Sequence, residues 1–301
     1  MSEQVVWTQW EDLNVPNIFK RLSPTTTPIK DGDFTEVTFY VPWYMGGRDA
    51  LELTKKMPKL KVLQVPNAGY DDAIEYVRPG MTLCNGKSIH DDSTAELAVG
   101  LTIASLRGFP DFVRNQDKSE WVHVKNKSIN DRKIGIIGFG SIGTTIAKML
   151  SGFAVEIIAF TQSGRDNTIA ISDIDKHLPT LDVVILILPL TKESKHLFDA
   201  KRLALMKDGS LLVNVARGPI VDTDALVKEL NSGRITAALD VTDPEPLPKD
   251  HQLWRAKGVL ISPHVGGNTT AFERRARRLI ESQLNLLAEG KHLNNIIVAG
   301  S

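Results

Sequence analysis

The length, composition and charge of the chain limit what the protein can be. It has 301 residues, of which 42% are hydrophobic and 24% are charged. It can therefore bury a large core, and at roughly 150 residues per domain its length favours two domains. Lys plus Arg and Asp plus Glu both number 36, so the formal net charge is zero. This balance argues against a dedicated nucleic-acid binder, which needs a basic surplus, and against an acidic disordered chain.

The N-terminal segment, the most apolar run and the single cysteine together favour a cytoplasmic protein. The opening MSEQVVWTQWEDL has neither the basic n-region nor the apolar h-region of a signal peptide. The most apolar run, residues 183–190, is far shorter than the ~20 residues needed to cross a bilayer. Cys84 has no second cysteine with which to form an internal disulfide. We expect no membrane association.

In the first third of the chain, short β-rich runs alternate with polar or helical stretches. Strands are predicted at residues 5–10, 37–41, 62–65 and 82–84. The segment 94–107 has a strongly helical pattern that is apolar on most sides, which predicts a buried connecting helix. This alternation predicts a small doubly wound domain.

The middle of the chain carries the clearest strand and helix pattern. A helix is predicted from about residue 142 to 150, and another begins near Asp222 and Thr223, which are good N-caps, and ends near Gly233. Strands are predicted at residues 133–137, 155–160, 183–188, 211–215, 235–240 and 259–261. Their near-continuous apolar character is typical of a parallel sheet that is covered on both faces.

The end of the chain completes a two-domain α/β architecture. A final helix is predicted from about residue 269 to 289, and the tail after it is expected to return to the first domain. We predict two doubly wound parallel-sheet domains. Residues 99–269 form a Rossmann dinucleotide-binding domain, and residues 1–98 with 270–301 form a discontinuous, flavodoxin-like substrate domain. The cleft between them is the expected active site.

A glycine-rich turn, Gly138-Phe139-Gly140-Ser141-Ile142-Gly143, lies between a predicted strand and a predicted helix. In this context the G-x-G-x-x-G spacing indicates dinucleotide binding, and a plain glycine turn is the less favoured alternative. The three glycines allow a tight turn, close approach of a pyrophosphate and close packing of helix on sheet. The start of the helix supplies N–H groups for the phosphates. Gly138, Gly140, Ser141, Ile142 and Gly143 are therefore predicted cofactor ligands.

The segment after the second strand of this domain indicates the cofactor preference. An acidic residue is expected roughly 20 positions after the glycine turn. Thr161 stands there instead, followed by Gln162, Ser163 and Arg165. A carboxylate repels a 2′-phosphate, whereas hydroxyls and an arginine can accept one through charge-assisted hydrogen bonds. We expect NADP to be favoured over NAD; alternatively, Arg165 points to solvent and the ribose site is permissive.

Three ionisable side chains follow predicted strands of the same domain. They lie in the segments NVARGP, LDVTDPEP and SPHVGG, and the carboxyl ends of parallel strands face one crevice. Arg217 can bind a carboxylate and carbonyl as a planar, permanent cation. His264 can act as general acid–base, and Glu245 can orient its ring and favour the protonated form. Alternatively, if each residue is considered alone, Arg217 is interpreted as a surface salt-bridge partner and His264 as an ordinary loop histidine. Together they favour reduction of a 2-keto acid by hydride transfer.

At this point the chain resembles the D-isomer-specific 2-hydroxyacid dehydrogenases over essentially its whole length. The matching segments are GFGSIG, LPLTKES, LLVNVARGPIVDTDALVKEL, AALDVTDPEPLP, HQLW and ISPHVGGNT, with LKVLQVPNAGYD and STAELAVGLTIASLRG in the front half. The resemblance implies catalytic Arg217, Glu245 and His264. It also implies that Asp240 holds the nicotinamide carboxamide, and that Ala216, Pro189 and Thr191 line the cofactor channel.

The resemblance also implies a substrate site, an assembly and an activity. Backbone N–H groups near Ala68 and Gly69 would bind the substrate carboxylate together with Arg217 and His264, and two copies would pair as a homodimer through their nucleotide domains. The activity implied is NAD(P)H-dependent reduction of a 2-keto acid, glyoxylate or hydroxypyruvate before others. The alternatives are a D-3-phosphoglycerate dehydrogenase without a regulatory domain and, from another class, a nucleotide-sensing, corepressor-like binding module.

Two positions depart from the family's usual pattern, and other signals carry little weight. Thr161 replaces the usual acidic residue, and Thr242 replaces the usual aromatic two positions after Asp240. Glu245 stands where formate dehydrogenases of the superfamily carry glutamine, which disfavours formate oxidation.

No metal site is expected, because no ligand set with suitable spacing is evident. Trp121 is interpreted as a packing residue.

Overall fold

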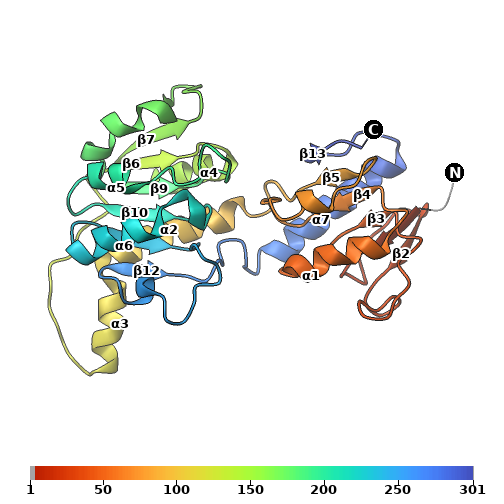
Figure 1. Ribbon diagram of the computed structural model, residues 1–301, viewed down its shortest axis with the longest axis horizontal. Coiled ribbons are helices and arrows are strands. Elements are labelled where there is room, and N and C mark those ends of the chain that lie inside the picture. The colour runs from red at the N-terminus through yellow and green to blue at the C-terminus, as the bar shows by residue number, and fades with distance from the viewer. Residues whose placement is uncertain (1–3, 301) are drawn as a thin grey trace. The chain divides into compact units, whose positions relative to one another are not determined.

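The computed structural model describes residues 4–300 and divides into two compact units (Figure 1). Unit 1 comprises Met1–His90 and Thr270–Ser301, and unit 2 comprises Asp91–Thr269. The limit predicted after residue 98 falls inside helix α2 (Asp91–Arg107). Within the described chain, no helix is both long enough and apolar enough to cross a bilayer.

Unit 1 is built on a six-stranded sheet in the order β13-β5-β4-β3-β1-β2. The strands are β1 Gln4–Trp7, β2 Phe19–Leu22, β3 Phe39–Tyr40, β4 Val62–Gln64, β5 Thr82–Cys84 and β13 Ile296–Val298. All neighbours pair in parallel except β13, which is antiparallel to β5. The parallel order 2-1-3-4-5 is the flavodoxin-like one, as predicted. The pairing of β13 with β5 also confirms that the tail returns to the first domain.

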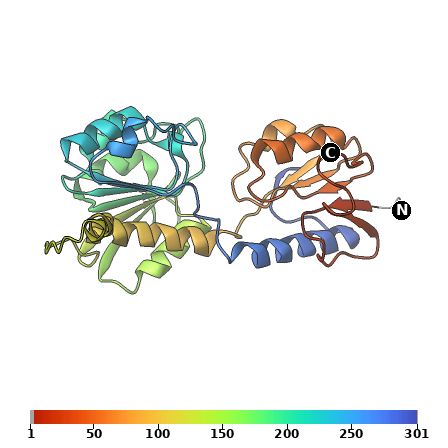
Figure 2. The same ribbon diagram turned by 90° about the horizontal axis from the view of Figure 1, so that it is seen from below.

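Helices cover both faces of the unit 1 sheet, because alternate strand residues point to opposite sides. One core contains Trp7 and Leu63 and is covered by α1 (Gly47–Glu52) and η1 (Leu53–Lys56). The other contains Val6 and Val62 and is covered by α7 (Phe272–Ala288). Figure 2 shows α7, in blue, and α1, in orange, on opposite sides of this sheet. A short helix, η2, occupies Ile74–Tyr76.

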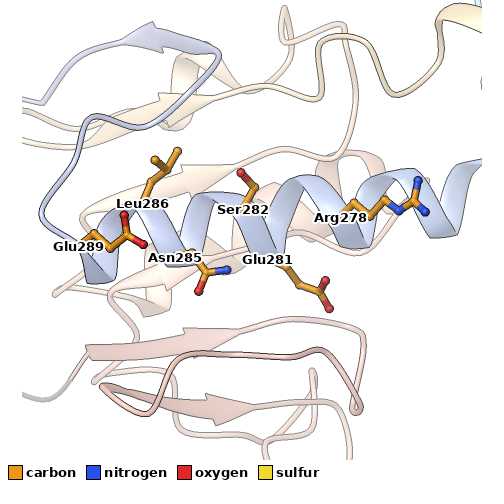
Figure 3. Close-up of a pocket in the computed structure, with 6 residues that line it drawn as sticks. All are labelled: Arg278, Glu281, Ser282, Asn285, Leu286 and Glu289. Atoms are coloured by element: carbon orange, nitrogen blue, oxygen red, sulfur yellow. The ribbon is translucent and has the colours of Figure 1, made fainter.

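The outer face of α7 carries a polar surface pocket (Figure 3). Its lining residues are Arg278, Glu281, Ser282, Asn285, Leu286 and Glu289. None of them is a predicted site residue; five come from α7, and Glu289 directly follows it. This pocket therefore reflects the solvated side of α7.

Unit 2 is built on a seven-stranded, wholly parallel sheet in the order β12-β11-β10-β9-β6-β7-β8. The strands are β6 Arg132–Ile137, β7 Val155–Thr161, β8 Ile169–Ala170, β9 Val183–Leu186, β10 Leu211–Asn214, β11 Thr236–Leu239 and β12 Val259–Ile261. In chain order this is the Rossmann arrangement 3-2-1-4-5-6 with one further strand. The predicted fold class is confirmed for both units.

Two helical layers sandwich the unit 2 sheet. On one face, α2 and α4 (Ser141–Leu150) pack against one set of strand side chains, which includes Val183 and Ile185. On the other, α5 (Ala200–Leu205) and α6 (Thr223–Ser232) pack against Val184 and Leu186. Short helices occupy Ile171–Lys176, Leu178–Thr180, Gly218–Ile220 and Gln252–Arg255. The predicted caps of α6 are confirmed: the Asp222 carboxylate accepts from Ala225 N at 3.0 Å, and Gly233 has φ +76°.

Helix α3 (Phe109–Asp117) and the segment after it expose apolar side chains. No α3 residue is buried, and Val113 is 59% exposed. Trp121 is 99% exposed, so its interpretation as a packing residue is wrong. The misreading has a physical reason: tryptophan buries much apolar area in most settings, but residues 118–129 contain no helix or strand to fold its ring onto the core. This apolar surface, defined by Phe109, Phe112, Val113, Trp121, Val122 and Val124, is called the α3 arm below.

Candidate active site

The glycine turn joins β6 to α4 in the geometry that the motif predicts. Gly138 has φ +101°, and a Cβ there would lie 2.1 Å from the Ile187 carbonyl oxygen. A Cβ on Gly143 would lie 2.3 Å from the Gly138 carbonyl oxygen. A Cβ on Gly140, by contrast, would meet no atom within 4 Å. The protein's own packing therefore requires the first and third glycines, whereas the second faces open space.

These features fit the pyrophosphate of a dinucleotide. The first helical hydrogen bond of α4 runs from Thr144 N to Gly140 O at 2.9 Å, so the N–H groups before it are available at the helix start. A helix N-terminus with this exposed glycine approach attracts phosphate. The Ser141 hydroxyl donates to the Asp91 carboxylate at 3.2 Å, which ties the start of α4 to the start of α2.

At the end of β7, Thr161 belongs to a closed turn. Its hydroxyl lies 2.7 Å from the Thr168 hydroxyl and accepts a hydrogen bond from Gly164 N at 3.1 Å. The Arg165 side chain is 68% exposed and lies 3.8 Å from the Asp166 carboxylate. Gln162 and Ser163 are exposed as well. The turn thus presents one cation and no carboxylate between residues 161 and 165.

The loop after β9 holds Pro189 and Thr191, the predicted channel residues, and both are exposed. The Ser194 hydroxyl organises it. That hydroxyl donates to Pro189 O at 2.8 Å and accepts from Thr191 N at 2.7 Å, while Thr191 Oγ1 accepts from Ser194 N at 3.2 Å. The loop is therefore closed on itself by buried Ser194, a residue that the sequence interpretation did not single out.

The three predicted catalytic residues follow three adjacent strands, β10, β11 and β12. His264 Nδ1 lies 2.5 Å from Glu245 Oε1, and the two side chains are 44% and 40% exposed. His264 has φ +52°, a conformation that non-glycine residues rarely adopt and that often marks a functional site. The geometry thus leaves Nε2 as the ring nitrogen that can exchange a proton with a ligand.

The pKa of the Glu245 carboxyl lies below its ordinary value. Partial burial acts to raise this pKa, but the hydrogen bond and charge of His264, the Thr242 N–H and the charge of Arg217 outweigh it. Glu245 is therefore a carboxylate at neutral pH. A carboxylate at hydrogen-bond distance from an imidazole favours the protonated ring.

Arg217 sits in a turn that buried Asn214 shapes. The Asn214 amide donates to Arg217 O at 3.0 Å and its oxygen accepts from Ala216 N at 3.1 Å. A Cβ on Gly218 would lie 1.9 Å from the Thr242 carbonyl oxygen. The Arg217 turn therefore packs directly on the loop that carries Glu245.

Asp240 is buried, and its carboxylate shapes the His264 loop. One carboxylate oxygen accepts from the Ser262 hydroxyl at 2.6 Å and from Val265 N at 2.9 Å, and the other accepts from Gly266 N at 2.9 Å. The Asp240 carbonyl also accepts from His264 N at 2.7 Å. Asp240 thus fixes the backbone on which His264 stands, and its role toward the nicotinamide carboxamide stays a prediction.

Thr242, where the family usually has an aromatic, also has a structural role. Its hydroxyl donates to Pro244 O at 2.8 Å, and the Thr223 hydroxyl donates to Asp243 O at 2.8 Å. Both bonds hold the loop that presents Glu245. The sequence signal that could have found Asn214, Thr242 and Ser262 is their shared position: each is a polar residue at the end of an apolar strand or within three residues after it.

Ala68 and Gly69 lie in unit 1, in the segment that follows β4. The Ala68 carbonyl accepts from Asn85 Nδ2 at 2.6 Å, and the Asn67 carbonyl accepts from Gly86 N at 2.6 Å. Their role in binding a substrate carboxylate stays a prediction.

Comparisons with known proteins agree with this geometry. The family model described as "D-isomer specific 2-hydroxyacid dehydrogenase, NAD binding domain" matches residues 99–266. A glyoxylate reductase of Thermofilum pendens is 33% identical over 255 residues, which are 80% of this chain and 75% of that protein. A D-3-phosphoglycerate dehydrogenase of Methanocaldococcus jannaschii is 29% identical over 280 residues, which are 89% of this chain but 52% of that protein.

A solved structure extends the similarity to the whole fold. The crystal structure of a D-isomer specific 2-hydroxyacid dehydrogenase family protein from Aeromonas salmonicida is 25% identical. The match has a TM-score of 0.86 and covers 99% of each chain. The glycine turn and the segments with Arg217, Glu245 and His264 all lie inside the matched regions.

Proposed function

Because the chain belongs to the D-isomer specific 2-hydroxyacid dehydrogenase family, we propose that it reduces glyoxylate or hydroxypyruvate, with NADPH as the preferred cofactor. It is an NAD(P)-dependent oxidoreductase that acts on the CH–OH group of donors. The observation that carries the proposal is the pair of His264 Nδ1 and Glu245 Oε1 at 2.5 Å, next to the Arg217 turn and in the same unit as the glycine turn.

The roles of the residues follow from this pair. Bound NAD(P)H supplies the hydride that converts the keto carbon to a carbinol carbon. His264 donates a proton from Nε2 to the oxygen that becomes the hydroxyl, and it takes the proton back in the oxidative direction. Glu245 stabilises the protonated ring through Nδ1, and Arg217 offers a planar cation to the carbonyl and carboxylate oxygens. The overall gain of one hydride and one proton gives the 2-hydroxy acid.

The preference for NADPH rests on the turn after β7. Residues 161–165 contain no carboxylate to repel a 2′-phosphate, and the exposed Arg165 guanidinium is near the turn formed by Thr161. Charge-assisted hydrogen bonds from arginine to phosphate are strong. Replacing Arg165 by Ala is expected to raise the KM for NADPH about ten-fold and to leave the KM for NADH nearly unchanged. Equal effects on both cofactors would contradict this role.

The alternative functions are not favoured. The glyoxylate reductase of T. pendens is matched over 75% of its length, whereas the M. jannaschii D-3-phosphoglycerate dehydrogenase is matched over 52%. A corepressor-like module would have no need of a proton-donor pair, yet Glu245 and His264 are in hydrogen-bond contact.

The α3 arm supports the proposal of a homodimer through unit 2. Exposed apolar patches of this kind are typical of protein interfaces, and tryptophan is enriched at their centres. The proposed occupant is the α3 arm of a second copy. Light scattering of the wild type is expected to give a dimer, and Trp121→Ser a monomer; a monomeric wild type would contradict the proposal. A cytoplasmic location stays a prediction.

The decisive experiment is initial-rate oxidation of NADPH and of NADH, measured side by side against glyoxylate and hydroxypyruvate. The proposal predicts turnover of at least one of these acids, with a higher kcat/KM for NADPH. A preference for NADH would overturn the argument from Thr161 and Arg165 alone. No turnover of either acid with either cofactor, and oxidation of D-3-phosphoglycerate instead, would overturn the proposed substrate.

A further inference from the structure

We propose that Asn85 positions the N–H groups of unit 1 that bind the substrate carboxylate, as the last member of a chain of buried amides that begins on α7. The inference rests on the proposed function, because it takes Ala68 and Gly69 as the groups that bind this carboxylate. Asn85 touches neither substrate nor cofactor in this proposal and is a positioning residue.

Three side-chain amides are buried in unit 1. Gln64, at the end of β4, and Gln283, on α7, are both 0% exposed, and Asn85, directly after β5, is 6% exposed. A buried amide costs free energy unless its hydrogen bonds are made, so an apolar side chain would pack at lower cost in these places. Their presence calls for a role that an apolar residue cannot perform.

The amides form one directed chain whose orientation the backbone fixes. Asn294 N donates to Gln283 Oε1 at 2.8 Å, so the NH2 group of Gln283 faces Gln64 Oε1, also at 2.8 Å. Gln64 Nε2 in turn donates to Asn85 O at 3.1 Å. Asn85 Nδ2 donates to Ala68 O at 2.6 Å, while its Oδ1 accepts from Lys87 N at 3.3 Å. Flipping any one amide would set donor against donor or acceptor against acceptor.

The chain ends on the peptide whose N–H is the predicted carboxylate donor. Ala68 O and Gly69 N belong to one peptide plane, in which a trans C=O and N–H point in opposite directions. With Ala68 O held by Asn85, Gly69 N–H is directed away from Asn85. The preceding peptide is held in the same way, because Asn67 O accepts from Gly86 N at 2.6 Å and Ala68 N–H points away from Gly86. Residues 85 and 86 thus orient both donors.

Asn85 also strengthens the Gly69 donor. A hydrogen bond to a peptide carbonyl polarises that peptide and makes its N–H a better donor. Gln64 acts in the same way toward Ala68 N–H, because it bonds Asn85 O, and the N–H of that peptide, on Gly86, bonds Asn67 O. Every member of the chain is uncharged. The neighbouring Cys84 is neutral too, because burial raises the pKa of its thiol to about 11.

The test compares Asn85→Asp and Asn85→Ala with the matched control Asn17→Asp. The first change is isosteric: it keeps an acceptor for Lys87 N but sets a carboxylate oxygen against Ala68 O. Asn17 is an exposed residue of the same unit, so the control makes the same change from amide to carboxylate outside the chain of buried amides. The measurements are kcat and KM for glyoxylate, the Kd for NADPH by fluorescence titration, and Tm.

Asn85→Asp is expected to raise the KM for glyoxylate at least ten-fold with kcat within about three-fold of wild type, and Asn85→Ala to raise it less. The Kd for NADPH is expected to stay unchanged in both, and Asn17→Asp to keep KM within about two-fold. A wild-type KM in folded Asn85→Asp, or an equal rise in the Asn17→Asp control, would overturn the inference. If the wild-type enzyme turned over no 2-keto acid, the proposed function itself would fall, a result that needs no variant.

Discussion

Replacing Glu245 by Gln should slow 2-keto acid reduction. The variant keeps the shape of the side chain and an oxygen for His264 Nδ1, but it removes the negative charge that lies 2.5 Å from the ring. Reduction takes a proton from the imidazole, and the Glu245 charge stabilises the ring that carries this proton. The variant is therefore expected to have a lower kcat/KM than the wild type.

The size of this effect follows from the exposure of the pair. In water two unit charges 4 Å apart attract by about 1 kcal/mol, and near a protein surface by about 4 kcal/mol. Because the two side chains are 44% and 40% exposed, solvent screening keeps the attraction toward the lower of these values. An attraction of about 1.4 kcal/mol corresponds to about ten-fold in rate.

The assay is kcat/KM for glyoxylate with saturating NADPH at pH 7, measured for the wild type, Glu245→Gln and a control. Asp250→Asn is a suitable control, because it removes an equal charge from an exposed residue of the same unit. Glu245→Gln is expected to lower kcat/KM about ten-fold, and the control to leave it unchanged. A wild-type kcat/KM in folded Glu245→Gln would refute the assignment of Glu245.

Two further predictions concern the cofactor turn and the stability of unit 2. The Cβ of Gly140→Ala meets no protein atom, so this variant should keep the wild-type Tm while raising the Kd for NADPH at least ten-fold. The Cβ of Gly143→Ala would lie 2.3 Å from Gly138 O, so that variant should lower Tm. Equal effects of the two variants on Tm would contradict these roles of the two glycines. Burial acts to raise the pKa of the Asp182 carboxyl, but the Lys207 ammonium, the Lys133 N–H and the charge of Arg132 outweigh it, so this pKa lies below its ordinary value. A carboxyl whose pKa is lowered by folding contributes stability above its unfolded pKa and loses it as pH falls through the folded value. Urea unfolding should therefore find Asp182→Asn about 1–3 kcal/mol less stable than wild type at pH 7, and the gap should close in acid; a gap that persists at pH 2 would contradict the ionic origin.

Much of unit 2 could be predicted because local signals agreed with one another there. The glycine turn follows an apolar strand and opens a helix, and the caps Asp222 and Gly233 bound α6 as expected. Helix α3 and strand β2 were not predicted. Helix α3 has Phe109, Phe112 and Val113 at helical spacing, but only Gly108 separates it from α2, so the sequence does not mark it as a second helix. Strand β2 has two exposed residues among four and lies at a sheet edge, which leaves little pattern to read.

The candidate site divides in a similar way. Arg217, Glu245 and His264 could be chosen from the sequence, because each follows an apolar strand and their chemistry is complementary. The groups that hold them could not. Asp240 and Ser262 are 22 residues apart in the chain, and Gln64 and Gln283 are 219 apart, so only the packed structure brings them into contact. Thr242, which sequence comparison marks only as a departure, proves to bond the Glu245 loop.

The central claim is that His264 is the proton donor in an NAD(P)H-dependent reduction of a 2-keto acid. Its most direct test is the kcat of His264→Ala with glyoxylate and NADPH, together with the Kd for NADPH. The account predicts a fall in kcat of about a hundred-fold or more with the Kd unchanged, since removal of a general acid–base typically costs that much. Turnover close to wild type in the folded variant would contradict it.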